Sequence, residues 1–281
     1  MGADQAYPIE PINRRFAPAI KLSCCAYSYR DYLQANKQPQ LSLEQFMDTC
    51  AELGLDGTEL TSYYFNDTSE AYLHQVKRHA FLLGLDVSGS AVGNTFTLPP
   101  GEQRDGQVAM TKQWVERAAL LGAPCLRVFA GSVPEGATVE QARAWCIECL
   151  QECLPVAEQH GVMLALENHG GITDTAEHVL SIITAVDSDW LGLNLDTGNF
   201  HTADPYADLA AAAPYAVTTH LKSEIHPAGG EATEVDCARL IAILQAANYR
   251  GYLSLEYEAA EDPLTAVPKV FGRVREALAG G

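Results

Sequence analysis

The sequence predicts an α/β protein with a single (β/α)8 TIM-barrel domain. Short apolar runs alternate with amphipathic stretches on a repeat of roughly 30 residues, which is typical of βα units around a parallel sheet. The length of 281 residues suits one such barrel. A doubly wound sheet would also fit the alternation, but it usually carries a Gly-rich phosphate loop after its first strand. Because neither GxGxxG nor GxxxxGK(S/T) occurs in the chain, the barrel is preferred.

The expected domain covers residues 20–281 and follows an N-terminal arm, residues 1–19. Each expected strand is a short apolar run bounded by polar residues or glycine. The segment at 31–40 is polar and is expected to be irregular. The expected strands lie within residues 20–29, 55–60, 85–94, 125–131, 162–171, 191–196, 217–222 and 251–257.

The expected helices begin at side chains that cap a helix N-terminus, and several end at glycine. Ser42 begins the first, either Thr68 or Ser69 the second, and either Thr173 or Asp174 a later one. The predicted helical spans are 42–53, 68–84, 105–121, 138–160, 173–186, 236–248 and 263–279.

Composition excludes several classes of partner. The formal net charge is −18, from 18 Lys and Arg against 36 Asp and Glu, and such a surface repels nucleic-acid phosphates. No apolar run approaches the length of about 18 residues that a membrane span needs. The N-terminus has no apolar stretch after its charged residues, as an intact signal peptide would have. We therefore expect a cytoplasmic protein without a nucleic-acid or membrane partner, although an upstream export signal stays an alternative.

The cysteine pattern predicts core packing. Cys146, Cys149 and Cys153 share one face of the helix expected at 138–160, but no second CxxC pair completes a zinc site. Free cysteine behaves as a small buried hydrophobe. Cys24 and Cys25 are neighbours in a strand and should point to opposite faces.

Four ionisable side chains follow or end the last four apolar runs, at equivalent positions. In a parallel barrel the C-terminal ends of the strands meet at one mouth, where active sites form. Three carboxylates and an imidazole suit one divalent ion, either Mn²⁺, Mg²⁺, Co²⁺ or Zn²⁺. Any of these residues alone would be typical of a helix cap or a buried histidine, so the prediction depends on the set. The predicted metal ligands are Glu167, Asp196, His220 and Glu256.

Further polar groups stand near these positions and are candidates for binding the substrate. Glu59 could bind a hydroxyl or support a metal ligand, Arg127 could clamp an oxyanion, and alternatively the two pair with each other. Lys222 shares a strand face with His220, or else neutralises an acidic rim. Glu258 is interpreted as a surface group. The substrate-binding candidates are Glu59, Arg127, His169, Asn199, His201 and Lys222.

Several segments resemble the sugar phosphate isomerase/epimerase family of xylose isomerase-like barrels, which includes ketose 3-epimerases, hydroxypyruvate isomerase and inosose dehydratase. The similar segments are KLSCCAYSYRDYL, LGLDGTEL, LENHGG, NLDTGNF, THLKSE and YRGYLSLEYE, so the resemblance covers nearly the whole chain. It implies one divalent metal on the four ligands named above, with Glu167 and Glu256 also exchanging substrate protons. Asn199 departs from the family, which often has histidine there, and His201 follows two residues later.

The resemblance implies a sugar isomerase or epimerase that abstracts a proton next to a carbonyl through a metal-stabilised enediolate. Its partner would be a ketose-type or polyol-derived small molecule, and homo-oligomers are common in the family. The same residues would serve a dehydratase or lyase that eliminates a β-substituent from an inosose or a 3-keto-glycoside. An endonuclease of abasic DNA is disfavoured because the second and third runs lack the extra histidines of that class. A non-catalytic sugar-binding barrel would bind no metal.

Overall fold

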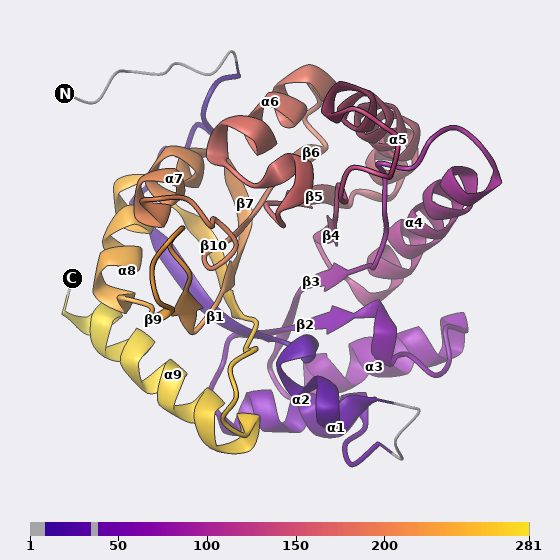
Figure 1. The fold of residues 1–281 in the computed structure, drawn as a ribbon. Helices are drawn as coiled ribbons and strands as arrows, with labels where there is room; N and C mark the ends of the chain where they lie inside the picture. The colour runs from indigo at the N-terminus through magenta and orange to yellow at the C-terminus, as the bar shows by residue number, and fades with distance from the viewer. Residues whose placement is uncertain (1–8, 35–38, 281) are drawn as a thin grey trace.

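The computed structural model describes residues 9–34 and 39–280, and it confirms the predicted barrel. Eight parallel strands close on themselves in the order β1-β10-β7-β6-β5-β4-β3-β2, and the helices form an outer ring (Figure 1). The barrel strands are β1 (Ala19–Cys25), β2 (Gly57–Thr61), β3 (Asp86–Ala91), β4 (Cys125–Val128), β5 (Met163–Glu167), β6 (Leu191–Asp196), β7 (Ala216–Leu221) and β10 (Arg250–Leu255).

Most helices begin where the sequence supplies capping side chains, whereas α1 and α4 have no side-chain cap. Ser42 and Thr138 each form a reciprocal capping box with the glutamine three residues later, and Ser69 caps the third helix. The helices are α1 (Arg30–Leu33), α2 (Leu43–Glu52), α3 (Glu70–Leu82), α4 (Glu102–Leu121), α5 (Val139–His160), α6 (Ala176–Val186), α7 (Pro205–Ala212), α8 (Cys237–Ala246) and α9 (Pro263–Ala279). None of those in the described part of the chain is long and apolar enough to cross a membrane.

The structure differs from the sequence prediction at several connections. The first strand ends at Cys25, and the chain turns there into a 3-10 helix, η1 (Ala26–Tyr29), and then into α1. The cap of α6 is Thr175, because η4 (Gly171–Thr173) takes up the first of the two predicted caps. Two features outside the prediction are α7 and an antiparallel hairpin of β8 (Glu224–Ile225) and β9 (Thr233–Glu234). Of the segment predicted as irregular, residues 35–38 lie outside the described residues.

Part of the N-terminal arm is tied to the barrel. Residues 9–18 contain neither helix nor strand. The Arg14 guanidinium donates hydrogen bonds to the backbone carbonyl oxygens of Pro214 and Ala216, just before and at the start of β7. Residues 1–8 lie outside the described part of the chain, so the domain division stays a prediction.

The eight cysteines are all buried free thiols. Cys146, Cys149 and Cys153 line the inner face of α5 within the hydrophobic core cluster, which confirms that they pack in the core. Cys24 and Cys25 point to opposite faces of β1: the Cys24 thiol lies with the hydrophobic core cluster, and that of Cys25 lies against Glu59.

Candidate metal centre

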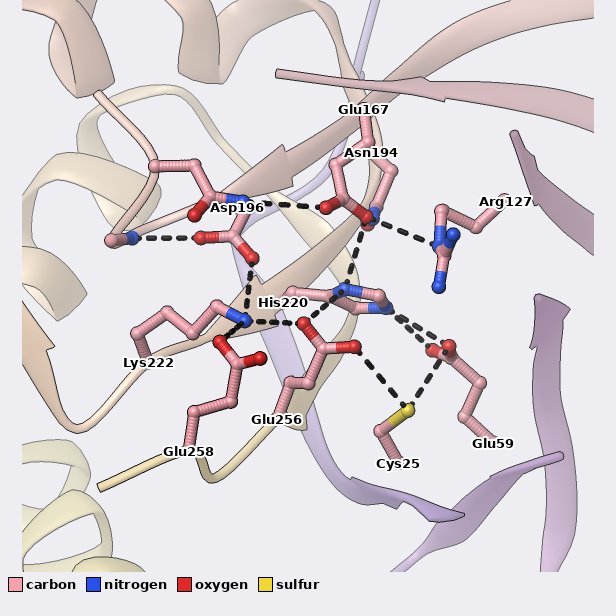
Figure 2. A network of polar contacts seen from close by, with 12 residues as sticks. Cys25, Glu59, Arg127, Glu167, Asn194, Asp196, His220, Lys222, Glu256 and Glu258 are labelled. Carbon is pink, nitrogen blue, oxygen red and sulfur yellow. Dashed lines mark hydrogen bonds and ion pairs between the residues drawn. The ribbon is translucent and has the colours of Figure 1, made fainter. Parts of the chain in front are cut away.

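The four predicted ligands converge at the C-terminal mouth of the barrel (Figure 2). Glu167 ends β5, Asp196 ends β6, His220 lies in β7, and Glu256 directly follows β10. One ligand atom from each residue lies within 4.8 Å of the others, and at most 4% of any of the four residues is exposed.

The strand register brings these residues together although they are distant in sequence. Asp196 is paired with His220 across β6 and β7, and Glu167 with Asn194 across β5 and β6. Residues in register on adjacent parallel strands point to the same side of the sheet, and Asn194 lies two residues before Asp196 on the same face. The Asn194 amide accordingly donates to Oε2 of Glu167 at 2.8 Å.

The imidazole of His220 is oriented by Glu59. Its Nε2 lies 2.9 and 3.1 Å from the two carboxylate oxygens of Glu59, so Nε2 donates the hydrogen bond. Nδ1, the nitrogen that would bind a metal in the tautomer with its proton on Nε2, faces Glu167 and Glu256 at 3.3 and 3.6 Å from their Oε2 atoms. A carboxylate that fixes the second nitrogen of a histidine is the usual support of a metal-binding imidazole.

Two buried ligand atoms have no hydrogen-bond partner among the described residues, and both fit a metal ion. They are Nδ1 of His220 and Oδ2 of Asp196, while Oδ1 of Asp196 accepts from the Gly198 amide at 2.8 Å. Buried polar atoms are rarely left without a partner. The donor set of three carboxylates and one imidazole suits a hard or borderline divalent ion.

The charge of the interior also fits a divalent cation. Four buried carboxylates, those of Glu59 and the three acidic candidate ligands, face two buried cations, Arg127 and Lys222. The Arg127 Nε lies 3.2 Å from Oε2 of Glu167, and the Lys222 Nζ lies 2.5 Å from Oε2 of Glu256. Burial acts to lower the pKa of His220, but Glu59 and Glu256 outweigh it and hold that pKa well above the ordinary value. With the imidazole protonated, one of the four negative charges remains uncompensated, and buried charges are costly unless paired.

The surrounding charges shift the pKa values of the carboxyl groups in different directions. Burial raises the pKa of Asp196 to about 7, although Lys222 opposes the rise. Burial also acts to raise the pKa of Glu256, but Lys222 and His220 outweigh it and hold that pKa well below the ordinary value. For Glu167, Arg127 and His220 likewise outweigh burial, so its pKa is lowered. Both glutamates are therefore ionised, as a base must be.

Four of the substrate-binding candidates contact the ligands and two do not. Arg127, Lys222 and Asn199 contact carboxylate ligands; the Asn199 amide donates to Oε1 of Glu167 at 3.3 Å. Glu59 binds the fourth ligand, His220. His169 and His201 are exposed at the rim, where His169 packs on the Phe129 ring and His201 lies 3.2 Å from the backbone oxygen of His226.

One alternative left open by the sequence was wrong: Glu59 and Arg127 do not pair with each other, since Glu59 binds His220 and Arg127 binds Glu167. Glu258 is exposed, as expected of a surface group, but its carboxylate also binds the Lys222 ammonium beside Glu256. The position of Glu258, two residues after Glu256, was the sequence feature that could have indicated this contact.

Sequence reasoning also missed two residues that contact the cluster. The Cys25 thiol lies 3.6 Å from Oε1 of Glu59 and 3.9 Å from Oε1 of Glu256. Asn194 binds Glu167 as described above. The strand position of Asn194, two residues before Asp196, could have revealed it, whereas nothing in the sequence places Cys25 against strands β2 and β10.

The fold and the cluster define a TIM barrel with a candidate metal centre at its strand ends. The sequence matches the family described as Xylose isomerase-like TIM barrel over residues 47–277, so the chain belongs to that family. Among curated proteins, none matches the chain by sequence.

Solved structures of sugar epimerases share the fold. An L-ribulose 3-epimerase has a TM-score of 0.74 and 18% identity, covering 93% of this chain and 96% of that one. A 3-keto-D-glucoside 4-epimerase from E. coli has a TM-score of 0.72 and 19% identity, covering 92% and 99%. The IolI protein with a bound zinc atom has a TM-score of 0.71 and 19% identity, covering 92% and 97%. At these identities the similarity establishes the fold alone.

Proposed function

We propose that the chain is a divalent-metal-dependent isomerase or epimerase of a ketose-type or polyol-derived sugar. The observation that carries the proposal is the convergence of two buried, ionised glutamates with the orphaned ligand atoms of Asp196 and His220. Sugar epimerases among the similar folds, and the zinc atom in one of them, support it. Glu167, Asp196, His220 and Glu256 would hold Mn²⁺, Mg²⁺, Co²⁺ or Zn²⁺.

The two glutamates would carry the protons. When bound, the metal supplies Lewis acidity that stabilises negative charge on the substrate oxygens. Glu167 and Glu256 come from β5 and β10, which are separated in the barrel by β6 and β7, so they approach the cluster from different directions. One carboxylate removes the proton next to the carbonyl, and the other, once it has taken up a proton from solvent, returns that proton to the substrate. The first carboxylate then releases its proton to solvent, which restores both groups. Return to the opposite face gives an epimer, and return to the neighbouring carbon gives an aldose–ketose isomer.

The other buried groups would hold this pair in place. Arg127 and Asn194 bind Glu167 and keep its carboxylate ionised and oriented. Asn199 approaches the second oxygen of Glu167 and would contact the substrate beside it. The rim histidines, His169 and His201, would bind distal hydroxyl groups. Groups fixed by their neighbours lower the cost of orienting the reacting atoms.

The experiment is solvent-deuterium exchange into candidate substrates, followed by NMR. Protein loaded with Mn²⁺ is incubated in D₂O with ketoses, inososes and 3-keto-glycosides, the manganese is then removed for the spectra, and the products are identified. We expect exchange next to the carbonyl with the wild type, and loss of at least about 100-fold in Glu167→Gln and Glu256→Gln. Glu158→Gln, which removes an exposed carboxylate at the end of α5, is the matched control.

The results separate this proposal from its alternatives. Full exchange in both variants would exclude the two glutamates from the reaction. An unsaturated keto product would assign a dehydratase or lyase that uses the same pair. Repeated purification without bound metal, together with no binding of added Mn²⁺, would indicate a non-catalytic barrel.

A further inference from the structure

The candidate ligands are shielded from solvent, and Lys222 is one of two side chains, with Asn199, that contact a ligand and also line an open cavity. A cavity of about 340 Å³ lies at the barrel mouth. Lys222 and Glu258 line it, whereas none of the four ligands does. Lys222 itself is only 7% exposed, because its side chain is inserted between the cavity and the cluster.

The ammonium group of Lys222 occupies the ligand cluster itself (Figure 2). Its Nζ lies 2.5 Å from Oε2 of Glu256 and 3.5 Å from Oδ2 of Asp196, which accepts no hydrogen bond from the part of the chain that the structure describes. The third contact of Nζ is Glu258, whose side chain is 43% exposed on the cavity side. The ammonium therefore joins two ligand carboxylates on one side to a solvent-facing carboxylate on the other.

The loop after β6, which contains Gly198, leaves space for the side chain of Lys222. A Cβ added to Gly198 would lie 2.5 Å from Cγ of Lys222, so only glycine leaves room for the stem. The same glycine donates its amide to Asp196. The chain thus places the lysine stem directly against the loop that carries a ligand.

We propose that Lys222 is an internal counter-ion that competes with the divalent metal for Asp196 and Glu256, and that it moves onto Glu258 when the metal and the substrate enter. The inference rests on the proposed metal-dependent function. Two cations cannot share the same carboxylate oxygens at close range, since their repulsion is large in a buried site. A lysine has a long flexible stem, and a rotation of that stem toward Glu258 keeps the ammonium paired while it opens the cavity to the ligands.

The experiment measures Mn²⁺ affinity by isothermal titration calorimetry on metal-stripped protein, together with its thermal unfolding midpoint. In Lys222→Met we expect Mn²⁺ to bind at least about tenfold more tightly, because its competitor is absent. The metal-free variant should unfold several degrees lower, because buried carboxylates lose their partner. Lys222→Gln is the second variant should the first not fold. Lys21→Met, which breaks a surface pair with Asp86, is the matched control.

A double-mutant cycle separates competition from simple charge removal. Glu258→Gln removes the alternative partner of the ammonium, so it should weaken Mn²⁺ binding several-fold when Lys222 is present. In the Lys222→Met background the same change should have no effect. Equal weakening in both backgrounds would show that Glu258 acts only through its charge and would overturn the proposed movement.

The outcomes also distinguish this inference from the proposed function. Unchanged or weaker Mn²⁺ binding in Lys222→Met, with a wild type that does bind Mn²⁺, overturns the competition and leaves the metal-dependent function intact. Failure of both proteins to bind Mn²⁺ overturns both proposals.

Discussion

The contact between Glu59 and His220 allows the support of the proposed metal centre to be tested apart from its ligands. Both oxygens of Glu59 lie within hydrogen-bonding distance of Nε2 of His220, at 2.9 and 3.1 Å. Glu59→Gln keeps the size of the side chain but removes its charge and one of its two acceptor oxygens. The imidazole is then held less firmly in the tautomer that exposes Nδ1 to the cluster.

The magnitude follows from the kind of hydrogen bond that is lost. A bond to a charged partner contributes about 1.5–3 kcal/mol, and a neutral one about 0.5–1.5 kcal/mol. The midpoints of these ranges differ by about 1.25 kcal/mol, which corresponds to somewhat less than tenfold in affinity at about 1.4 kcal/mol per factor of ten. We therefore expect Mn²⁺ to bind about tenfold more weakly to Glu59→Gln, at the lower end of the roughly 10–100-fold seen for lost supports of metal ligands.

Calorimetric titration of metal-stripped protein with Mn²⁺ measures the effect, and the chain supplies a matched control. Asp48 makes a similar contact with Nε2 of His79, at 2.8 Å, but on the surface. Asp48→Asn should leave Mn²⁺ affinity unchanged. An affinity of Glu59→Gln within twofold of the wild type would refute the argument that Glu59 prepares His220 to bind a metal.

Two further predictions concern protonation and backbone geometry. Because burial raises the pKa of Asp196 to about 7, a metal ion must displace its proton below that pH. Mn²⁺ affinity should fall about fivefold from pH 7 to pH 6 and by a factor approaching about ten for each further unit, and titrations at pH 6, 7 and 8 that show no change would contradict this. In Gly171→Ala, the added Cβ would lie 2.5 Å from the Gly131 carbonyl oxygen, at a backbone φ of +57°. We therefore expect the free energy of unfolding, measured in urea, to fall by more than about 1 kcal/mol. Gly229 also has a positive φ, but an added Cβ would meet no atom there, so Gly229→Ala should lower the free energy of unfolding by less.

Most of the fold follows from local patterns in the sequence. The apolar runs and capping residues predict the eight strands and most helices, because burial and capping are decided within a few residues. The short helices α1 and α7 and the β8–β9 hairpin have too few residues to show a period. At α6 three adjacent residues, from 173 to 175, can all cap a helix, and only the path of η4 across the mouth selects Thr175.

The position of the candidate site was predictable, but its internal pairing was not. The equivalence of strand ends places Glu167, Asp196 and His220 at one mouth before any contact is known. Which carboxylate binds which cation depends on distances across the barrel interior. Glu59 and His220 are 161 residues apart in the chain and meet only through barrel closure. The same closure brings Lys222 between Glu256 and Glu258.

The two buried cations beside the ligands differ in mobility: Arg127 is held in place, and Lys222 can exchange one carboxylate partner for another. The Arg127 guanidinium is fixed, because it donates to the Val92 carbonyl oxygen at 3.1 Å, stacks 3.9 Å from the Phe129 ring centroid and faces Glu167. Lys222 has a flexible stem and an exposed alternative partner. A proton taken up by Glu167 therefore lies beside a fixed cation, whereas Glu256 lies beside Lys222, which borders the cavity. We expect the abstracted proton to exchange with solvent mainly at Glu256. Lys222→Met should therefore change the ratio between deuterium incorporation from solvent and product formation. An unchanged ratio would assign the solvent-exchangeable position to Glu167 instead.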